Sequence, residues 1–480
     1  MQPSKKFAVD VGITFLASAV TLPLGFVITV ALGKYLGAGD LGLYRMTSTI
    51  YGIAVLVAAI GIPAAMIKYV AEFKGDRTKI NQIVSSGVIT SLFLGIGFSA
   101  LFYVSSGLFA GIFDMPELSG LIKLLSPVFP FALVGGALLG LLNGIREMKK
   151  YAAATIVQSV LMVLITVALI YYGFGVAGAV IGLVLSSIGF CLFLGWIARK
   201  YFEITFHEYI PTTKKMLTFG AQIFGANAIN MINYQADLLL IGYFLTATNV
   251  GYYAVAVGLS RFFWIVPQAI QTISYPAISE YWADNNHPAL QTLIDKSMKY
   301  SACILLPMGL GVGFFAEDII TLIFGEGFIC AVLPLQILIV GTVIIGIAKS
   351  IGSFLPSVGR PDLSLKINGT GAIINLILNI LLIPFLGISG AALATTISLI
   401  VISILTIYLM IQVGQIEINI KPYALLSITA IFAIALFMYL NWVNIYLTGF
   451  LILGIYIIMI FVFVLTEEDK QIFKSLIYPF

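Results

Sequence analysis

The chain is a succession of apolar runs, and each run is long enough to cross the hydrocarbon core of a bilayer. Hydrocarbon offers no partner for backbone amides, so such runs must be helices, and the lack of strict alternation excludes a β-barrel. The composition agrees, because 60% of the residues are hydrophobic and only 10% are charged, whereas a soluble domain is about a quarter charged. Fourteen helices are predicted, near residues 7–32, 42–68, 82–109, 120–143, 152–172, 176–198, 216–245, 250–276, 298–316, 332–356, 366–385, 389–412, 422–440 and 445–465.

The sequence also repeats itself at an offset of roughly 209–213 residues, which is typical of transporters built from two related halves. The matched segments are 33–44 (GKYLGAGDLGLY) with 242–253 (GYFLTATNVGYY), 63–64 with 276–277, and 175–179 (GVAGA) with 387–391 (GISGA). Each repeat contains six helices, so both halves insert with the same orientation. We therefore predict an all-α integral membrane protein with two parallel six-helix lobes, 1–200 and 201–413, followed by a helix pair and tail, 414–480.

Basic residues are concentrated in alternate loops, as the positive-inside rule requires of cytoplasmic loops. These loops contain Lys68, Lys74, Arg77 and Lys79; Arg146, Lys149 and Lys150; Arg199, Lys200, Lys214 and Lys215; Lys296 and Lys299; Arg360 and Lys366; Lys421; and Lys470 and Lys474. The intervening loops hold Lys34 as their one basic residue. We predict a multi-pass protein of the cytoplasmic membrane with both termini in the cytoplasm, which requires an even number of helices.

Several segments resemble the oligosaccharide-lipid flippases of the multidrug/oligosaccharidyl-lipid/polysaccharide exporter superfamily. They are 36–44 (LGAGDLGLY), 237–244 (DLLLIGYF) leading to 250–253 (VGYY), and the stretch 358–396, which is the most specific part. The resemblance implies two bundles around a central cavity, alternating access, and transport of polyprenyl (pyro)phosphate-linked oligosaccharides from the inner to the outer leaflet. It also implies membrane lipids and glycan-assembly enzymes as partners, and we expect a monomer without a nucleic-acid partner.

Charged residues inside predicted spans are candidate functional residues, because each costs a few kcal/mol to insert. They are Asp10, Arg45, Lys123, Asp237, Arg261 and Lys349. Cations outnumber anions among them, and Lys and Arg bind phosphate oxygens through charge-assisted hydrogen bonds. This set therefore favours an anionic headgroup over a cationic drug as the substrate.

Asp237 and Arg261 each lie some ten residues from the turn between two adjacent antiparallel helices, which places both roughly 15 Å below the outer end. Their ion pair either locks the two helices together or opens when Arg261 exchanges Asp237 for substrate phosphate. Lys349 lies deeper, among Ile347, Ala348 and Ser350, and is assigned to a cavity.

Arg45 and Lys123 lie near outer helix ends, where a long basic side chain either enters a cavity or extends to the headgroups. Asp10 lies near the inner end of the first helix. It caps that helix, pairs with Lys6, or binds a coupling cation.

Asn227, Asn230 and Asn233 recur at three-residue spacing and therefore share one side of a helix. Their amides bind either sugar hydroxyls or a neighbouring helix. The nearby rings of Tyr234, Tyr243, Tyr252 and Tyr253 are either platforms for sugars or an interfacial belt.

Motifs of catalysis are absent: the sequence contains no HExxH, Walker A or GxSxG arrangement, so an enzyme is not expected. No cofactor is expected either. An inside-negative membrane favours outward movement of an anion by about 2.3 kcal/mol per charge per 100 mV, and a proton or Na⁺ gradient is an equally open energy source. An ion-coupled multidrug antiporter of the same superfamily remains the alternative function. The tail from Glu467 to Phe480 is predicted to rest on the inner membrane surface.

Overall fold

The computed structural model describes residues 3–440, 442 and 444–471, and the regular structure in this part of the chain is helical. The chain forms two compact units, Met1–Ala254 and Val255–Phe480, which we describe one at a time. The predicted all-α membrane class is confirmed. The predicted lobe boundaries at 200 and 413 stay a prediction.

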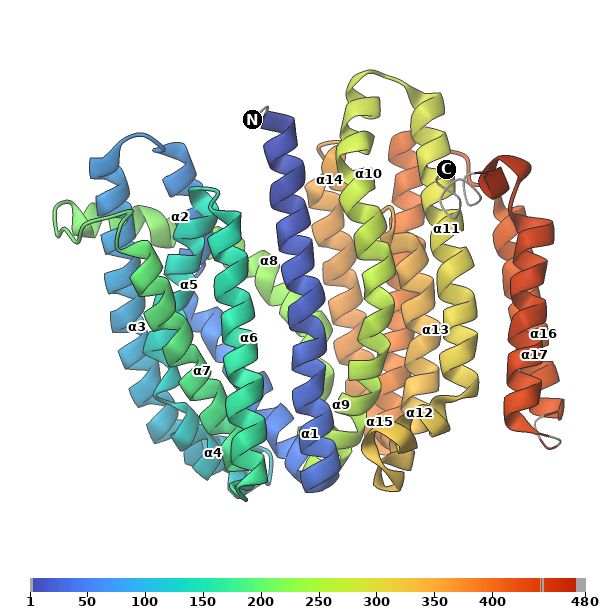
Figure 1. Cartoon of the computed structure of the whole chain (residues 1–480), viewed down its shortest axis with the longest axis horizontal. Coiled ribbons are helices and arrows are strands. Elements are labelled where there is room, and N and C mark those ends of the chain that lie inside the picture. Colours follow the sequence, from blue (N-terminus) through green and yellow to red (C-terminus); the bar gives the residue numbers. More distant parts are fainter. Residues whose placement is uncertain (1–2, 441, 443, 472–480) are drawn as a thin grey trace. The chain divides into compact units, whose positions relative to one another are not determined.

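Over its described residues, the first unit contains eight helices and the beginning of a ninth, which can be followed in Figure 1. They are α1 (Pro3–Ala59), α2 (Ile62–Glu72), α3 (Arg77–Ile112), α4 (Glu117–Leu125), α5 (Val128–Gly144), α6 (Met148–Tyr171), α7 (Gly175–Ala198), α8 (Tyr209–Phe244) and α9 (Ala247–Ser260).

The second unit continues from α9 through a 3₁₀ turn and a further set of helices. They are η1 (Arg261–Trp264), α10 (Ile265–Ala283), α11 (His287–Phe314), α12 (Ala316–Phe324), η2 (Glu326–Ala331), α13 (Val332–Lys349), α14 (Phe354–Ser357), α15 (Pro361–Gly414), α16 (Ile420–Leu440), α17 (Ile445–Met459) and the π-helical turn η3 (Ile460–Val464).

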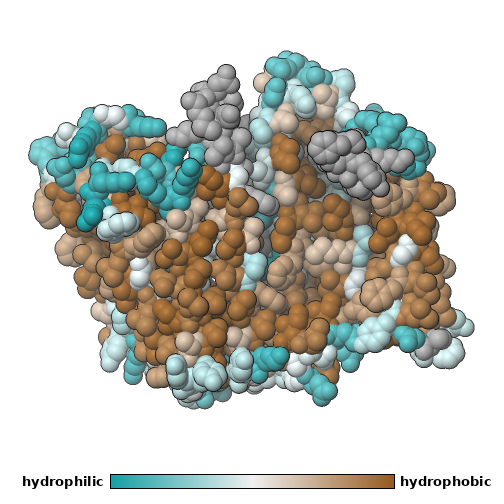
Figure 2. Space-filling model, viewed as in Figure 1, coloured by the Kyte–Doolittle hydropathy of each residue, from teal (hydrophilic) through white to brown (hydrophobic). Residues whose placement is uncertain are grey.

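Helix length and hydropathy agree with a membrane environment. Over the described residues, nine helices are long and apolar enough to cross a bilayer, and up to eleven if each of two bent pairs is one span. Two of these helices are kinked at glycines, α1 at Gly37 and α15 at Gly387, so each supplies two of the predicted runs. In both units hydrophobic side chains cover the flanks of the helices and hydrophilic ones gather at the helix ends (Figure 2). Lipid therefore replaces water around the flanks.

The internal repeat is visible in the backbone. Gly175 has φ 56° and the matched Gly387 has φ 58°, a left-handed conformation that glycine adopts without steric cost. Three residues later, a Cβ at Gly178 would lie 2.9 Å from Leu169 Cβ, and one at Gly390 would lie 2.5 Å from the Leu382 carbonyl oxygen. Both copies of the motif thus make a tight turn that folds one helix back onto the preceding one.

Small residues allow the helices of each unit to pack closely. In the first unit a Cβ at Gly182 of α7 would lie 2.2 Å from the Thr166 hydroxyl of α6. In the second unit a Cβ at Gly341 of α13 would lie 2.8 Å from Thr396 Cα in α15. Close backbone approach of this kind stabilises helix pairs in lipid, where burial of apolar surface contributes little.

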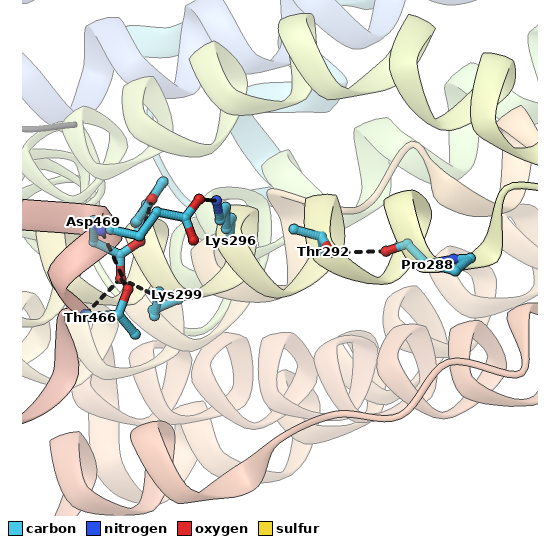
Figure 3. Close-up of polar contacts among 8 residues, drawn as sticks. Pro288, Thr292, Lys296, Lys299, Thr466 and Asp469 are labelled. Atoms are coloured by element: carbon cyan, nitrogen blue, oxygen red, sulfur yellow. Dashed lines mark hydrogen bonds and ion pairs between the residues drawn. The ribbon is translucent and has the colours of Figure 1, made fainter. Parts of the chain in front are cut away.

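The C-terminal helix pair packs on α11 in the second unit. Phe437 of α16 stacks on Phe314 of α11 with ring centroids 4.1 Å apart. Beyond η3 the chain returns to α11, where Lys296 pairs with Glu468 at 2.7 Å and Lys299 pairs with Asp469 at 2.5 Å (Figure 3). The beginning of the predicted surface tail is therefore bound to α11, and residues 472–480 lie outside the described part of the chain.

Asp469 is fully buried and accepts hydrogen bonds from four donors. They are Lys299 Nζ, Tyr300 OH at 2.6 Å, and the Thr466 amide and hydroxyl at 2.9 and 2.7 Å. Burial alone would raise the pKa of this carboxyl, but the hydrogen bonds outweigh burial and hold the pKa well below its usual range. Asp469 is therefore an ionised anchor for the chain that follows the helix pair.

Candidate functional site

Two of the predicted cations, Arg261 and Lys349, lie near Trp264 in the second unit. Lys349 ends α13, and its ammonium lies 4.0 Å from the centroid of the Trp264 indole. Arg261 begins the 3₁₀ turn that Trp264 ends, and side chains three residues apart eclipse each other in a 3₁₀ helix. Arg261 and Trp264 therefore share one side of the turn, and Trp264 brings Lys349 to that side.

The contact with Trp264 leaves the hydrogen-bond donors of Lys349 available to an anion. Arg261 is exposed and Lys349 is half-buried. An aromatic face stabilises an ammonium without consuming its hydrogen-bond donors, so Lys349 retains N–H groups for phosphate oxygens. A short 3₁₀ segment between two α-helices often marks a functional hinge.

Asp237 lies on α8 in the first unit and is buried. The Tyr253 hydroxyl of α9 donates a hydrogen bond of 2.8 Å to Asp237 Oδ2. Tyr253 is fully buried, so the expectation that it serves as a sugar platform or a belt residue is wrong. Arg261 belongs to the other unit, and its predicted pairing with Asp237 stays a prediction.

Arg45 lies in the part of α1 that follows the kink at Gly37. Its Nη2 donates a hydrogen bond to the hydroxyl of Thr29, a buried residue in the part of α1 that precedes the kink. The half-buried guanidinium thus joins the two segments of the bent helix. Its predicted contact with substrate stays a prediction.

The remaining predicted residues are dispersed. Lys123 is exposed on α4, with its ammonium 5.9 Å from the Tyr103 ring centroid. Asn227, Asn230 and Asn233 lie within α8, but their side chains lie outside the described residues, as does the side chain of Tyr234.

Asp10 forms an ion pair with Arg146 at 2.9 Å. The side chain of Lys6, the partner suggested by the sequence, lies outside the described residues. Arg146 lies in the turn between α5 and α6, so the pair ties the N-terminal part of α1 to that turn. A cavity of about 220 Å³ lies beside it, and its polar lining is contributed by Thr14, Ser18, Thr21, Asn143, Tyr151 and Thr155.

Two residues were missed by the sequence interpretation, Trp264 as a partner of Lys349 and Tyr253 as a partner of Asp237. Trp264 follows Arg261 by three residues, a spacing that signals a shared side of a helical turn. No feature of the sequence predicts the contact between Tyr253 and Asp237, because that contact depends on how α8 and α9 pack.

Comparison with known proteins finds relatives among membrane proteins and flippases. The chain is 27% identical to an uncharacterized membrane protein of Methanocaldococcus jannaschii, over 92% of each chain. It is 24% identical to a Haloferax volcanii protein named Probable flippase AglR, over 84% of this chain and 83% of that one.

Among solved structures, the inward closed conformation of the lipid II flippase MurJ has the same fold. The TM-score is 0.77 at 17% identity, covering 95% of this chain and 98% of that one. A family model described as "Polysaccharide biosynthesis protein" matches residues 31–333. Because this match spans more than half of the chain, the protein belongs to the polysaccharide biosynthesis protein family.

Proposed function

We propose that the protein is an alternating-access flippase that moves a polyprenyl (pyro)phosphate-linked oligosaccharide from the inner to the outer leaflet. The family and the flippase named among its relatives support this function. The observation that carries the proposal is the arrangement of Arg261 and Lys349 around Trp264 in the second unit. It offers two cations to a phosphate while the lipid tail remains in hydrocarbon.

The proposed chemistry is binding and release without a covalent step. Arg261 binds phosphate oxygens through its fork of N–H donors, and Lys349 adds a second positive charge at the same side of η1. Because η1 interrupts the helical run between α9 and α10, rotation about this turn changes the direction in which Arg261 is presented. Such a turn suits a site that must face the two sides of the membrane alternately.

The remaining assignments follow the same proposal. The protein lies in the cytoplasmic membrane with both termini in the cytoplasm, acts as a monomer, and receives its substrate from glycan-assembly enzymes. The membrane potential, a proton gradient or a Na⁺ gradient drives transport. Asn227, Asn230 and Asn233 contribute amides to the sugar, and Arg45, Lys123 and Asp237 adjust the charge around the phosphate.

The experiment is a leaflet-exposure assay with purified protein in sealed vesicles. A fluorescent polyprenyl diphosphate oligosaccharide is placed in the inner leaflet, and an impermeant lectin reports its arrival outside. A fluorescent lipophilic cation is tested in parallel vesicles. If the protein is a flippase, the diphosphate lipid becomes exposed faster in protein-containing vesicles than in empty vesicles. The lipophilic cation is not transported. Movement of the cation alone would contradict the proposal and support the multidrug antiporter.

A further inference from the structure

Three lysine side chains pack on aromatic rings near the end of α2 and the beginnings of α3 and α8, all within the first unit. The ammonium of Lys68 lies 4.1 Å from the Phe219 ring centroid, and that of Lys79 lies 4.4 Å from the Phe73 centroid. Lys215 lies between them, 4.5 Å from the centroid of Tyr69. We call this group the lysine–aromatic cluster, and it consists of Lys68, Lys79 and Lys215 with Tyr69, Phe73 and Phe219.

The shared rings keep the three ammonium groups close to one another. Lys68 and Lys215 both contact Tyr69, at 5.1 and 4.5 Å. Lys215 and Lys79 both contact Phe73, at 5.3 and 4.4 Å. Neighbouring ammonium nitrogens are therefore within about 10 Å, which is comparable to the Debye length at physiological salt. Like charges at this spacing repel each other until an anion neutralises them.

Acidic side chains near the cluster are committed elsewhere or leave the ammonium groups free. Arg77 pairs with Glu203 at 2.9 Å, and Asp76 accepts a hydrogen bond from the Lys79 amide as the cap of α3. Glu72 lies close to Tyr69, but within the described part of the chain no carboxylate forms an ion pair with any of the three lysines. All three side chains are exposed, so each retains N–H donors for a ligand.

We propose that the lysine–aromatic cluster binds the diphosphate group of a polyprenyl diphosphate lipid at the inner membrane surface, before the substrate enters the transport cycle. The cluster stands at the first turn of α3, which is itself a candidate membrane span, and therefore at headgroup level. A diphosphate diester carries two negative charges and a phospholipid diester one, so three ammonium groups favour the diphosphate. This inference rests on the proposed flippase function.

The test is a binding measurement with the full chain in phosphatidylcholine nanodiscs, without an ion gradient. The probe is a fluorescent short-chain polyprenyl diphosphate. Replacing all three lysines (K68Q, K79Q, K215Q) should weaken binding about tenfold or more. The charge-matched control replaces the exposed Lys149, Lys366 and Lys421 with Gln and should bind like wild type. Phe219→Leu keeps the charge and should weaken binding about threefold, because it removes the ring under Lys68.

Competition distinguishes the possible sources of phosphate. Inorganic pyrophosphate should displace the probe, because the diphosphate itself is recognised, and phosphatidylglycerol at the same molar amount should not. The inference is wrong if the cluster variant binds like its control, if pyrophosphate fails to compete, or if phosphatidylglycerol competes as well as unlabelled diphosphate lipid.

The two proposals fail in different ways. If the cluster variant binds the probe normally and the wild-type protein flips substrate, the proposed binding site at the cluster is wrong and the proposed flippase function stands. If binding depends on the cluster but the wild-type protein flips no substrate, the proposed flippase function is wrong and the diphosphate-binding site stands.

Discussion

Gly42 and Gly251 occupy matched positions in the two sequence repeats. Gly42 packs against the backbone at Ala247, and Gly251 packs against the backbone at Ala38. A Cβ at Gly42 would lie 1.7 Å from the Ala247 carbonyl oxygen, and a Cβ at Gly251 would lie 2.0 Å from the Ala38 carbonyl oxygen. Ala38 and Ala247 are themselves matched at the same offset. The contact between α1 and α9 is therefore reciprocal, as expected where two copies of one motif cross.

The reciprocal crossing predicts that neither glycine tolerates a methyl group. Gly42→Ala or Gly251→Ala should lower the free energy of unfolding by about 3 kcal/mol or more, because the backbones must separate. Thermal unfolding of the purified protein in detergent measures the effect. Gly107→Ala in α3, where a Cβ meets nothing within 4 Å, is the control and should leave the unfolding temperature unchanged or slightly raised. Equal stability of all three variants would contradict the crossing.

Trp264 is predicted to hold Lys349 in place for transport. Trp264→Leu keeps every charge but removes the aromatic face, so the initial rate of flipping should fall by about threefold to tenfold. Leaflet exposure of a fluorescent diphosphate oligosaccharide in vesicles measures the rate. The matched control is Trp196→Leu, which removes an exposed tryptophan at the end of α7. An unchanged rate in Trp264→Leu would show that the contact with Lys349 has no part in transport.

Asp469 is predicted to anchor the C-terminal segment to α11. Asp469→Asn should destabilise the protein by about 2–4 kcal/mol, because it leaves the ammonium of Lys299 without its buried counter-charge. Glu467→Gln, which removes the exposed pair with Lys470, should cost about 0.5 kcal/mol or less. Thermal unfolding of the two variants, side by side, makes the comparison, and a similar small loss in both would argue against the anchor.

The low pKa of Asp469 also fixes how this stability depends on pH. A carboxyl whose pKa is depressed by folding contributes its full stability above the unfolded pKa, about 4. The contribution is lost as the pH falls through the folded pKa. The difference between wild type and Asp469→Asn should therefore be constant between about pH 5 and 8 and shrink only in stronger acid.

The helices and the repeat could be predicted because each depends on local sequence. Apolar runs must be helical in lipid, and the positive φ of Gly175 and Gly387 falls in the two copies of one glycine motif. The sequence also singled out the cationic candidate residues, because charges are rare in membrane spans, and their role in binding stays a prediction.

Side-chain partners could not be predicted, since they depend on helix rotation and on local departures from α-helical geometry. The 3₁₀ turn at Arg261 was not expected, and this turn places Arg261 on the same side as Trp264, which contacts Lys349. Tyr253 turns inward to Asp237 because of the way α9 packs on α8. Asp10 pairs with Arg146, which is distant in sequence.

The central claim is that Arg261 and Lys349 hold the phosphate of a lipid-linked sugar while it crosses the membrane. The decisive measurement is the initial rate of leaflet exposure by Arg261→Gln, Lys349→Gln and the double variant, each at matched protein density. Arg360→Gln and Lys421→Gln, at exposed positions near helix ends, are the controls. The account predicts at least about a tenfold loss in each single variant and wild-type rates in both controls. Wild-type flipping by the double variant would contradict it.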